Sequence, residues 1–292
     1  EAVEAAIKFA RKFTGKKGMV AMSGSYHGKS LGALSLTFSQ KYRKPFSPLV
    51  EKVSFSSFGD IDALRTTVDS DTGFVIIEPI QGETGIHVPP DGFLQNARKL
   101  CDEKGILLIF DEIQTGLGRT GKMWASQHWD TVPDIMCLAK GIAGGVPMGA
   151  TLVKEEILAC INKGEHSSTF GGNPLSCAAG LATLQALTQD GLVENAAKMG
   201  KILHEGLERL KEKHSIIRQV RGKGLMIGAE MKFDVKEILL DGIRNGLLLL
   251  YSGRNILRFL PPLVISEEDI SKTLEILDVI LDREESRRNV QG

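Results

Sequence analysis

The stretch that decides the fold is Ile106-Leu107-Leu108-Ile109-Phe110-Asp111-Glu112, an unbroken apolar run that ends in two acids. A second apolar run, Ile135-Met136-Cys137-Leu138-Ala139, comes after a glycine-rich segment and is followed by Lys140 and Gly141. Short continuous apolar runs bounded by turn residues are typical of strands that are buried on both faces, as in parallel sheets. Because ligands of open α/β sheets bind at the carboxyl ends of the strands, the sequence places an acid and a lysine at the same edge of one sheet.

Outward from this stretch, similar apolar runs alternate with helical patterns. Strands are predicted at 19–22, 74–77 and 150–153, and helices at 31–36, 91–103 and 174–189, the last opened by Asn173-Pro174. From Leu192 the pattern changes to long helices, an alternating strand at 225–231 and short strands near Leu248 and Leu257. Ser266 and Asp269 open a final helix with a capping box. The sequence therefore predicts an α/β fold with a large domain over 1–190 and a smaller C-terminal α+β domain over 191–292.

Composition excludes several classes of protein. The 292 residues carry 36 basic and 36 acidic side chains, so the net charge gives no support for a nucleic-acid or membrane surface. No apolar run is long enough to span a membrane, and no signal peptide is visible. The four cysteines are scattered without a CxxC pair, which favours reduced thiols over disulfides or a metal site. We expect a cytoplasmic protein with no metal.

Two glycine motifs suggest nucleotide binding but have the wrong context. Gly116-Leu117-Gly118-Arg119-Thr120-Gly121 fits GxGxxG, yet Asp111 to Thr115 separate it from the strand and no helix start follows it. The same segment fits the start of a P-loop, but Met123 stands where Ser or Thr must bind magnesium. We therefore expect a glycine-rich surface turn, and a nucleotide-binding dehydrogenase is the weaker alternative.

Asp111 and Lys140 are the strongest candidates for chemistry. A lysine held against apolar walls loses affinity for its proton and becomes a usable nucleophile. A carboxylate opposite such an amine suits a pyridinium nitrogen opposite a Schiff base. The alternatives are a solvated Lys140 and an Asp111 that only caps a turn.

Several motifs in one order resemble the class III pyridoxal-phosphate aminotransferases, and the resemblance spans nearly the whole chain. Within that class the sequence is similar to the acetylornithine branch, which includes enzymes of lysine synthesis that act on an aminoadipate semialdehyde linked to a small acidic carrier protein. The segments that carry the resemblance are Glu78-Pro79-Ile80-Gln81-Gly82-Glu83, Phe110-Asp111-Glu112-Ile113-Gln114-Thr115-Gly116, Gly118-Arg119-Thr120-Gly121, Pro133-Asp134-Ile135, Ala139-Lys140-Gly141, Ser168-Thr169-Phe170-Gly171-Gly172-Asn173-Pro174 and 257–265.

The resemblance implies pyridoxal phosphate as the cofactor and fold type I, with a mostly parallel central sheet flanked by helices. Lys140 would bind the cofactor covalently and move a proton, and Asp111 would pair with the pyridine nitrogen. Gln114 would bind the ring hydroxyl group, while Ile113 and Tyr26 would pack on opposite ring faces. An ordinary loop tyrosine is the alternative for Tyr26.

The resemblance also implies residues for the substrate and for a second subunit. Thr169 would reach the phosphate of the neighbouring subunit's cofactor and Ser168 would lie beside the substrate, so a homodimer with shared sites is expected. Arg258 would bind a substrate carboxylate and pair with Glu83 when none is bound, although the two could form a purely structural ion pair. Lys29 stands where the acetylornithine branch usually has an arginine for the distal carboxylate.

The implied activity is transfer of the terminal amino group of an N-acylated ornithine- or lysine-type substrate to 2-oxoglutarate, in arginine or lysine biosynthesis. Ornithine and 4-aminobutyrate are alternative donors, and Lys41-Tyr42-Arg43-Lys44 or Arg221-Gly222-Lys223 could meet an acidic carrier. The first helix begins at Glu1 without a capping residue, and the family has a phosphate-binding Gly-Thr or Gly-Ser pair just before this position. We therefore expect an N-terminally incomplete sequence, and a catalytically incomplete fragment that only dimerises or binds is the alternative of another class.

Overall fold

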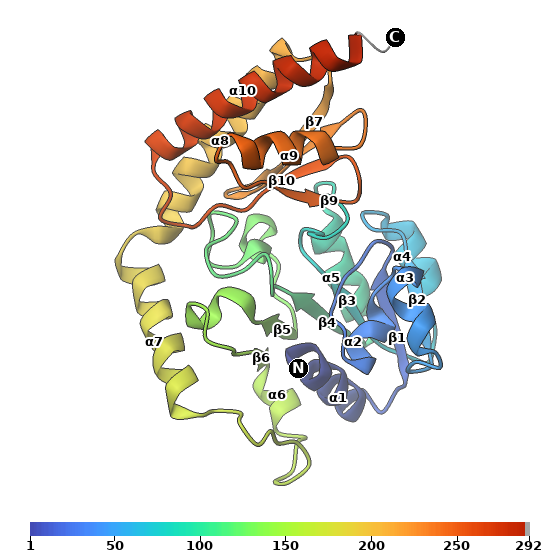
Figure 1. Ribbon diagram of the computed structural model, residues 1–292. Coiled ribbons are helices and arrows are strands. Elements are labelled where there is room, and N and C mark those ends of the chain that lie inside the picture. Colours follow the sequence, from blue (N-terminus) through green and yellow to red (C-terminus); the bar gives the residue numbers. More distant parts are fainter. Residues whose placement is uncertain (290–292) are drawn as a thin grey trace.

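The computed structural model describes residues 1–289, which form a larger α/β part and a smaller part above it in the view of Figure 1. The larger part is built on a six-stranded sheet with the order β2-β1-β3-β4-β5-β6. Its strands are β1 (Gly18–Met22), β2 (Val53–Ser56), β3 (Thr72–Ile77), β4 (Leu107–Asp111), β5 (Ile135–Leu138) and β6 (Ala150–Val153). All neighbours run parallel except the pair β5 and β6, so the expected mostly parallel sheet is confirmed.

Both faces of this sheet are buried, which explains why its strands read as continuous apolar runs. Along β1, Met19 and Ala21 pack on the face covered by α1 (Ala2–Thr14), whereas Val20 and Met22 pack on the face covered by α5 (Phe93–Lys104). Successive side chains of a strand point to opposite faces, so each face of the sheet requires its own set of apolar residues. The remaining helical segments of this part are α2 (Leu31–Leu36), α3 (Gln40–Arg43), η1 (Lys44–Phe46), α4 (Ile61–Thr67), η2 (Ala125–Trp129), η3 (Lys140–Ala143) and α6 (Glu155–Leu158).

The smaller part has its own antiparallel sheet, in the order β7-β8-β10-β9. Apolar residues of this sheet and of the long helices form a separate core. The elements are α8 (Leu192–Lys213), β7 (Ile217–Lys223), β8 (Met226–Met231), α9 (Lys236–Arg244), β9 (Leu250–Ser252), β10 (Ile256–Phe259) and α10 (Glu267–Asn289). The expected smaller α+β region is therefore present.

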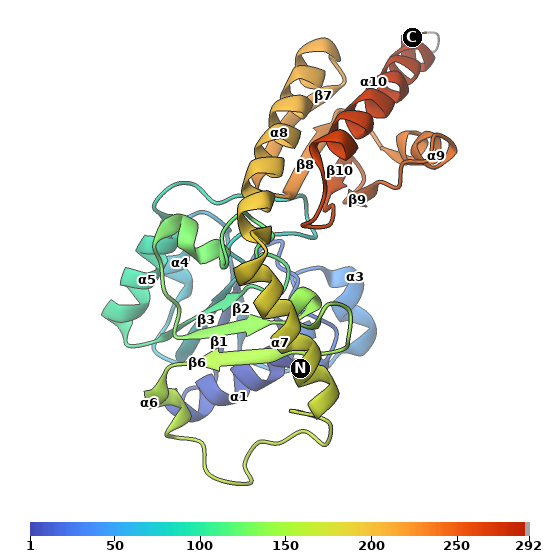
Figure 2. The same ribbon diagram turned by 90° about the vertical axis from the view of Figure 1, so that its left-hand side faces the viewer.

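Helix α7 (Pro174–Gln189) joins the two parts along one flank, and α8 continues from it into the smaller part (Figure 2). Gly191 separates the two helices with a left-handed backbone, φ 68°. We propose that the domain boundary lies here, near residue 190.

Most predicted elements are confirmed within a few residues. The helix expected at 91–103 begins at Phe93, because Gly92 has a φ of 82° and cannot belong to the helix. Asn173 caps α7, accepting a hydrogen bond from the Ser176 amide at 2.9 Å. Ser266 and Asp269 form the expected capping box of α10.

Two further observations concern the chain as a whole. The four cysteines are free thiols; Cys101 and Cys137 are buried, Cys160 is half-buried and Cys177 is exposed. Within residues 1–289, no helix combines the length and the apolar character that a membrane span requires.

Candidate active site

The carboxyl ends of β4 and β5 bring Asp111 and Lys140 to the same edge of the sheet. Asp111 is the last residue of β4 and pairs with Cys137 of β5, and Lys140 follows Cys137 by three residues. Neighbouring strands lie about 5 Å apart, so the two candidate residues follow adjacent strands of the sheet. Their common edge is the one at which α/β sheets bind ligands.

Asp111 is held in place by a buried histidine. Its Oδ2 atom lies 2.7 Å from Nδ1 of His27, and its Oδ1 atom accepts a hydrogen bond from the Ile113 amide at 3.1 Å. Both side chains are almost fully buried. Asp111 therefore does more than cap a turn, because His27 fixes the orientation of its carboxylate.

A second buried acid stands beside this pair. Glu78 follows β3 and accepts hydrogen bonds from the Tyr26 amide at 2.9 Å and the Gly82 amide at 3.3 Å. Burial raises the pKa of Glu78 to about 7; Asp111 adds to the rise and His27 opposes it. Glu78 thus connects the loop that carries Tyr26 and His27 to the loop that carries Glu83.

The sequence patterns did not single out His27 or Glu78. Glu78 follows a buried strand just as Asp111 does, so the same rule about strand ends could have found it. His27 lies in the loop after β1, where its neighbours Gly24, Ser25 and Gly28 gave only a turn signal.

Lys140 opens into a cavity of about 420 Å³ that Ile113, Gln114, Leu187 and Leu263 also line. The expectation that apolar walls enclose the lysine is wrong, because the residue is exposed. The physical reason is local: β5 ends at Leu138, and the turn η3 leads the chain out of the sheet to the mouth of the cavity. Lys140 has a φ of 36°, a left-handed value that is unusual for a residue with a side chain.

Arg258 and Glu83 meet as expected, across the boundary between the two parts of the molecule. Nη1 of Arg258 lies 2.9 Å from Oε1 of Glu83, and the arginine side chain is only 13 % exposed. The Glu83 carbonyl group also accepts a hydrogen bond from the Ser252 hydroxyl group of β9. The smaller part therefore contributes a cation to the site, and the larger part neutralises it.

Tyr26 and Lys29 belong to a small aromatic cluster beside this ion pair. The ring of Tyr26 meets Tyr42 edge-on, with ring centroids 5.9 Å apart, and Nζ of the exposed Lys29 lies 4.2 Å from the Tyr42 centroid. Burial raises the pKa of Tyr26, and Glu83 and Tyr42 add to the rise. This places Tyr26 within electrostatic reach of Glu83.

Ser168 and Thr169 are not brought to the cavity beside Lys140 of the same chain. Both are exposed and lie in the segment between α6 and α7, which projects away from the carboxyl ends of β4 and β5 (Figures 1 and 2). Lys8 and Lys12 of α1 bind this segment through His166 and Glu165.

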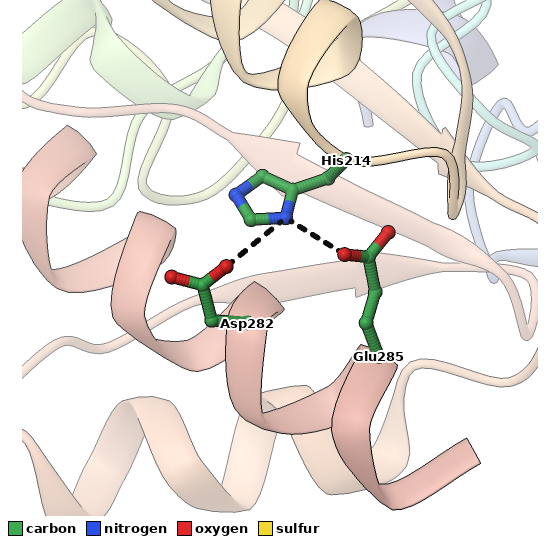
Figure 3. Close-up of side chains that lie close together, drawn as sticks. All are labelled: His214, Asp282 and Glu285. Carbon is green, nitrogen blue, oxygen red and sulfur yellow. Dashed lines mark hydrogen bonds and ion pairs between the residues drawn. The ribbon is translucent and has the colours of Figure 1, made fainter. Parts of the chain in front are cut away.

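A separate polar cluster lies in the smaller part, where His214, Asp282 and Glu285 converge between α8 and α10 (Figure 3). Nδ1 of His214 is 3.3 Å from Glu285 and 3.8 Å from Asp282, and Nε2 is 2.6 Å from Asp278. Lys213 also binds Asp278 and Asp282. Because two basic side chains already engage these acids, the cluster is an ion-pair network that joins α8 to α10.

Comparisons with known proteins agree with this geometry. The family model of class III aminotransferases matches residues 1–281, and the chain belongs to that family. It is thus a pyridoxal-phosphate-dependent transaminase, and the fold type expected from the sequence is confirmed.

The relatives are named as aminotransferases or transaminases. The acetylornithine aminotransferase of Caldanaerobacter subterraneus is 46% identical over 288 residues, which cover 96% of this chain and 73% of that protein. The crystal structure of the ornithine aminotransferase from Toxoplasma gondii ME49 superposes with a TM-score of 0.94 at 32% identity, over 98% of this chain and 71% of that one. An amine transaminase from an uncultivated Pseudomonas species, solved in its PLP-bound form, gives a TM-score of 0.89 at 31% identity, over 97% and 74%.

The residues at the sheet edge fit pyridoxal phosphate. Among residues 1–289, the buried Oε1 atom of Gln114 has no hydrogen-bond partner, which suits a ring hydroxyl group. Gly82 allows the Gln114 amide to lie close to the backbone, since a Cβ atom there would stand 2.2 Å from Oε1. The carboxylate of Asp111, oriented by His27, suits a protonated ring nitrogen.

Proposed function

We propose that this transaminase moves the terminal amino group of an N-acylated ornithine- or lysine-type substrate to 2-oxoglutarate. The observation that carries the proposal is the pairing of Arg258 with Glu83 beside the sheet edge that holds Asp111 and Lys140. A guanidinium group binds a carboxylate in a planar, bidentate manner, which a 2-oxo diacid offers. When Glu83 neutralises Arg258, the same pocket would also accept an amino donor that places no carboxylate next to the arginine.

Pyridoxal phosphate, when bound, supplies a conjugated ring that accepts the electrons released at the substrate carbon. In the proposed mechanism, the amine of Lys140 takes the proton from the amine-bearing carbon and later returns it. Asp111, whose carboxylate is oriented by His27, would hold a proton on the ring nitrogen. Gln114 would bind the ring hydroxyl group, while Ile113 and Tyr26 would pack against the ring.

The identity of the donor is proposed from the acetylornithine aminotransferases that the chain resembles. Lys29, exposed at the rim beside Tyr42, would meet the distal carboxylate of such a donor. Ornithine is the second candidate, because the similar structure from Toxoplasma gondii is an ornithine aminotransferase; 4-aminobutyrate is a third.

A carrier-linked donor is a finer alternative that requires basic residues around the entrance. Arg221 does not serve this purpose, because it pairs with Glu230 at 2.7 Å and donates to the Gly85 carbonyl group. Lys41 and Lys44 are exposed and close in sequence to Tyr42, so they would be the contact. A Michaelis constant that rises steeply with salt for the carrier-linked donor, but not for the free amino acid, would support this alternative.

We further propose that the enzyme is a homodimer whose sites draw on both subunits. Helix α7 contains no charged residue, yet it exposes Leu175 and Leu181, and Phe170 just before it is 80% exposed. An apolar surface of this kind is typical of an interface. In a second copy, Thr169 would reach the cofactor phosphate and Ser168 the substrate, which explains why they lie away from their own Lys140.

Spectroscopy and mass spectrometry test the core of the proposal. The purified protein mixed with pyridoxal phosphate is expected to absorb in the visible range, and borohydride reduction is expected to fix the cofactor on Lys140 alone. A profile of amino donors with 2-oxoglutarate then ranks N-acetylornithine, ornithine and 4-aminobutyrate. A colourless protein that binds no cofactor would instead favour the dimerising fragment, and nicotinamide binding would favour the dehydrogenase.

A further inference from the structure

The glycine-rich segment 116–121 is not the surface turn that its sequence predicts. Gly116, Leu117, Gly118 and Thr120 are buried, and the segment lies between the two parts of the molecule. A Cβ atom on Gly121 would stand 2.8 Å from Cα of Ala197 in α8, so backbone packs directly on backbone there. The prediction failed because the glycines permit close packing as well as tight turns.

Arg119 is the polar connection within this contact. Its carbonyl group accepts a hydrogen bond from the Leu225 amide at 3.0 Å, and its Nη1 atom donates to the carbonyl groups of Leu225 at 3.1 Å and Pro261 at 2.5 Å. Burial lowers the pKa of Arg119, and no carboxylate of residues 1–289 contributes to that shift. This half-buried cation binds neutral carbonyl groups in the turn between β7 and β8 and in the segment after β10, so it acts as a crosslink between the two parts.

Pro261 lies three residues after Arg258, on the segment that leaves β10. Arg258 is held from one side by Glu83, whose backbone is itself bound by Ser252. Arg119 binds the segment that follows the same strand, at Pro261, and also lines the cavity beside Lys140 and Gln114. The strand that carries Arg258 is therefore held at two points, by Glu83 at Arg258 itself and by Arg119 at Pro261, just beyond the end of β10.

We propose that Arg119 is a positioning residue of the transaminase: it fixes the end of β10 and so sets the place of Arg258 relative to Lys140. This inference rests on the proposed role of Arg258 as the site of the acceptor's carboxylate. It predicts that Arg119 acts on the acceptor half of the reaction and not on the donor half, where Lys29 would bind the distal carboxylate.

The test compares Arg119→Gln with Arg218→Gln in the full chain loaded with pyridoxal phosphate. Arg218 is a matched control, because it lies on β7 of the same sheet, is exposed and pairs with Glu230 and with no other acid among residues 1–289. Arg119→Gln is expected to raise KM for 2-oxoglutarate about tenfold, since two hydrogen bonds from a charged donor are lost. The rate of the donor half-reaction at saturating amino donor is expected to stay within about twofold of the wild type. Arg218→Gln is expected to change neither this rate nor KM for 2-oxoglutarate.

Hydrogen exchange gives a readout that does not depend on activity. Backbone amides in 255–263 are expected to exchange faster in Arg119→Gln than in Arg218→Gln and the wild type, with the cofactor bound in all three. If exchange at 255–263 and KM for 2-oxoglutarate both match the wild type, the proposal is wrong. A fall of donor and acceptor half-reactions by the same factor would also overturn it, because a general structural role has that effect.

Arg119→Lys keeps the proposal testable if the glutamine variant does not fold. Lysine is shorter and presents one ammonium group, so it is expected to reach only one of the two carbonyl groups and to raise the acceptor KM about threefold. A lysine variant with the wild-type KM contradicts the proposal. Failure of the proposed function is recognised separately, by a wild-type protein in which borohydride does not attach the cofactor to Lys140.

Discussion

Glu78 is an acid kept in the interior next to another acid, and its proton has consequences for stability. The side chain is 5% exposed, and burial is the largest cause that raises its pKa to about 7. The folded protein therefore keeps this proton up to about pH 7, whereas the unfolded chain releases it near the ordinary value of 4.5. Between these pH values the folded state binds more protons, so this group lowers the free energy of unfolding as the pH rises.

Glu78→Gln is expected to remove that pH dependence. Relative to the wild type, the variant should gain free energy of unfolding between pH 5 and pH 8, by about 3 kcal/mol at most. At pH 5 it should be equally or less stable, because glutamine accepts only one of the two amide hydrogen bonds. Urea unfolding at a series of pH values measures the difference, with Glu205→Gln on the exposed face of α8 as the control. A difference between variant and wild type that does not change with pH would contradict the assignment.

Arg258→Ala tests the proposed acceptor site at its centre. Loss of a charged bidentate partner is expected to raise KM for 2-oxoglutarate about 10- to 100-fold, while the reaction with the amino donor changes little. Single-turnover kinetics of the two half-reactions separate these effects. Arg244→Ala, on the exposed face of α9, is the control. Unchanged kinetics with the acceptor would leave Arg258 and Glu83 as a purely structural ion pair.

Single residues were predictable from the sequence where a strand-end rule applied to them. Asp111, Lys140 and the pair Arg258–Glu83 were found in this way or through the resemblance, and their contacts are present. The partnership of His27 with Asp111 was not predictable, since 84 residues separate the two; His27 follows β1 and Asp111 ends β4, between which β3 lies in the sheet. The exposure of Lys140 was also missed, because a sequence does not show where a turn leads a chain out of a sheet.

Elements of the molecule were predictable when both of their faces are buried. The strands β3, β4 and β5 read as apolar runs for that reason. The strands β2 and β7 were missed; each is an edge strand, and β7 carries five polar or glycine residues among its seven. A short edge strand that buries only one face can have too few apolar residues for its sequence to be distinguished from that of a loop.

The contact between segment 116–121 and helix α8 can be tested with two alanine variants. Gly121 and Gly15 both have a left-handed backbone, with φ values of 82° and 68°, but only Gly121 meets another backbone. Gly15→Ala is expected to lower the free energy of unfolding by about 1 kcal/mol, the ordinary loss at such a position. Gly121→Ala is expected to lose at least about 2 kcal/mol, because the new methyl group also collides with Ala197. Equal losses in urea unfolding would show that the close contact is not important for stability.

The whole molecule presents one flank that a single copy leaves uncovered. Leu181→Glu, in the middle of the exposed face of α7, is expected to convert a dimer into monomers and to abolish activity, since a charge in an apolar interface has no partner. Analytical ultracentrifugation measures the association state. Leu248→Glu is the control, because Leu248 is 85% exposed in the smaller part and lies far along the chain from α7. A Leu181→Glu protein that stays dimeric would place the interface elsewhere.

The left-handed backbone of Lys140 lowers the stability of the folded chain at a residue that is needed for its reactive amine. Glycine adopts a φ of 36° more easily than any other residue, whereas alanine keeps the Cβ atom that opposes it. Glycine is usually less stabilising than alanine, but here Lys140→Gly is expected to have a free energy of unfolding about 1 kcal/mol higher than Lys140→Ala. Urea unfolding measures the difference, and both variants are expected to lack activity. If the more stable of these variants is inactive, Lys140 is retained for the chemistry of its amine and not for its suitability to this backbone conformation.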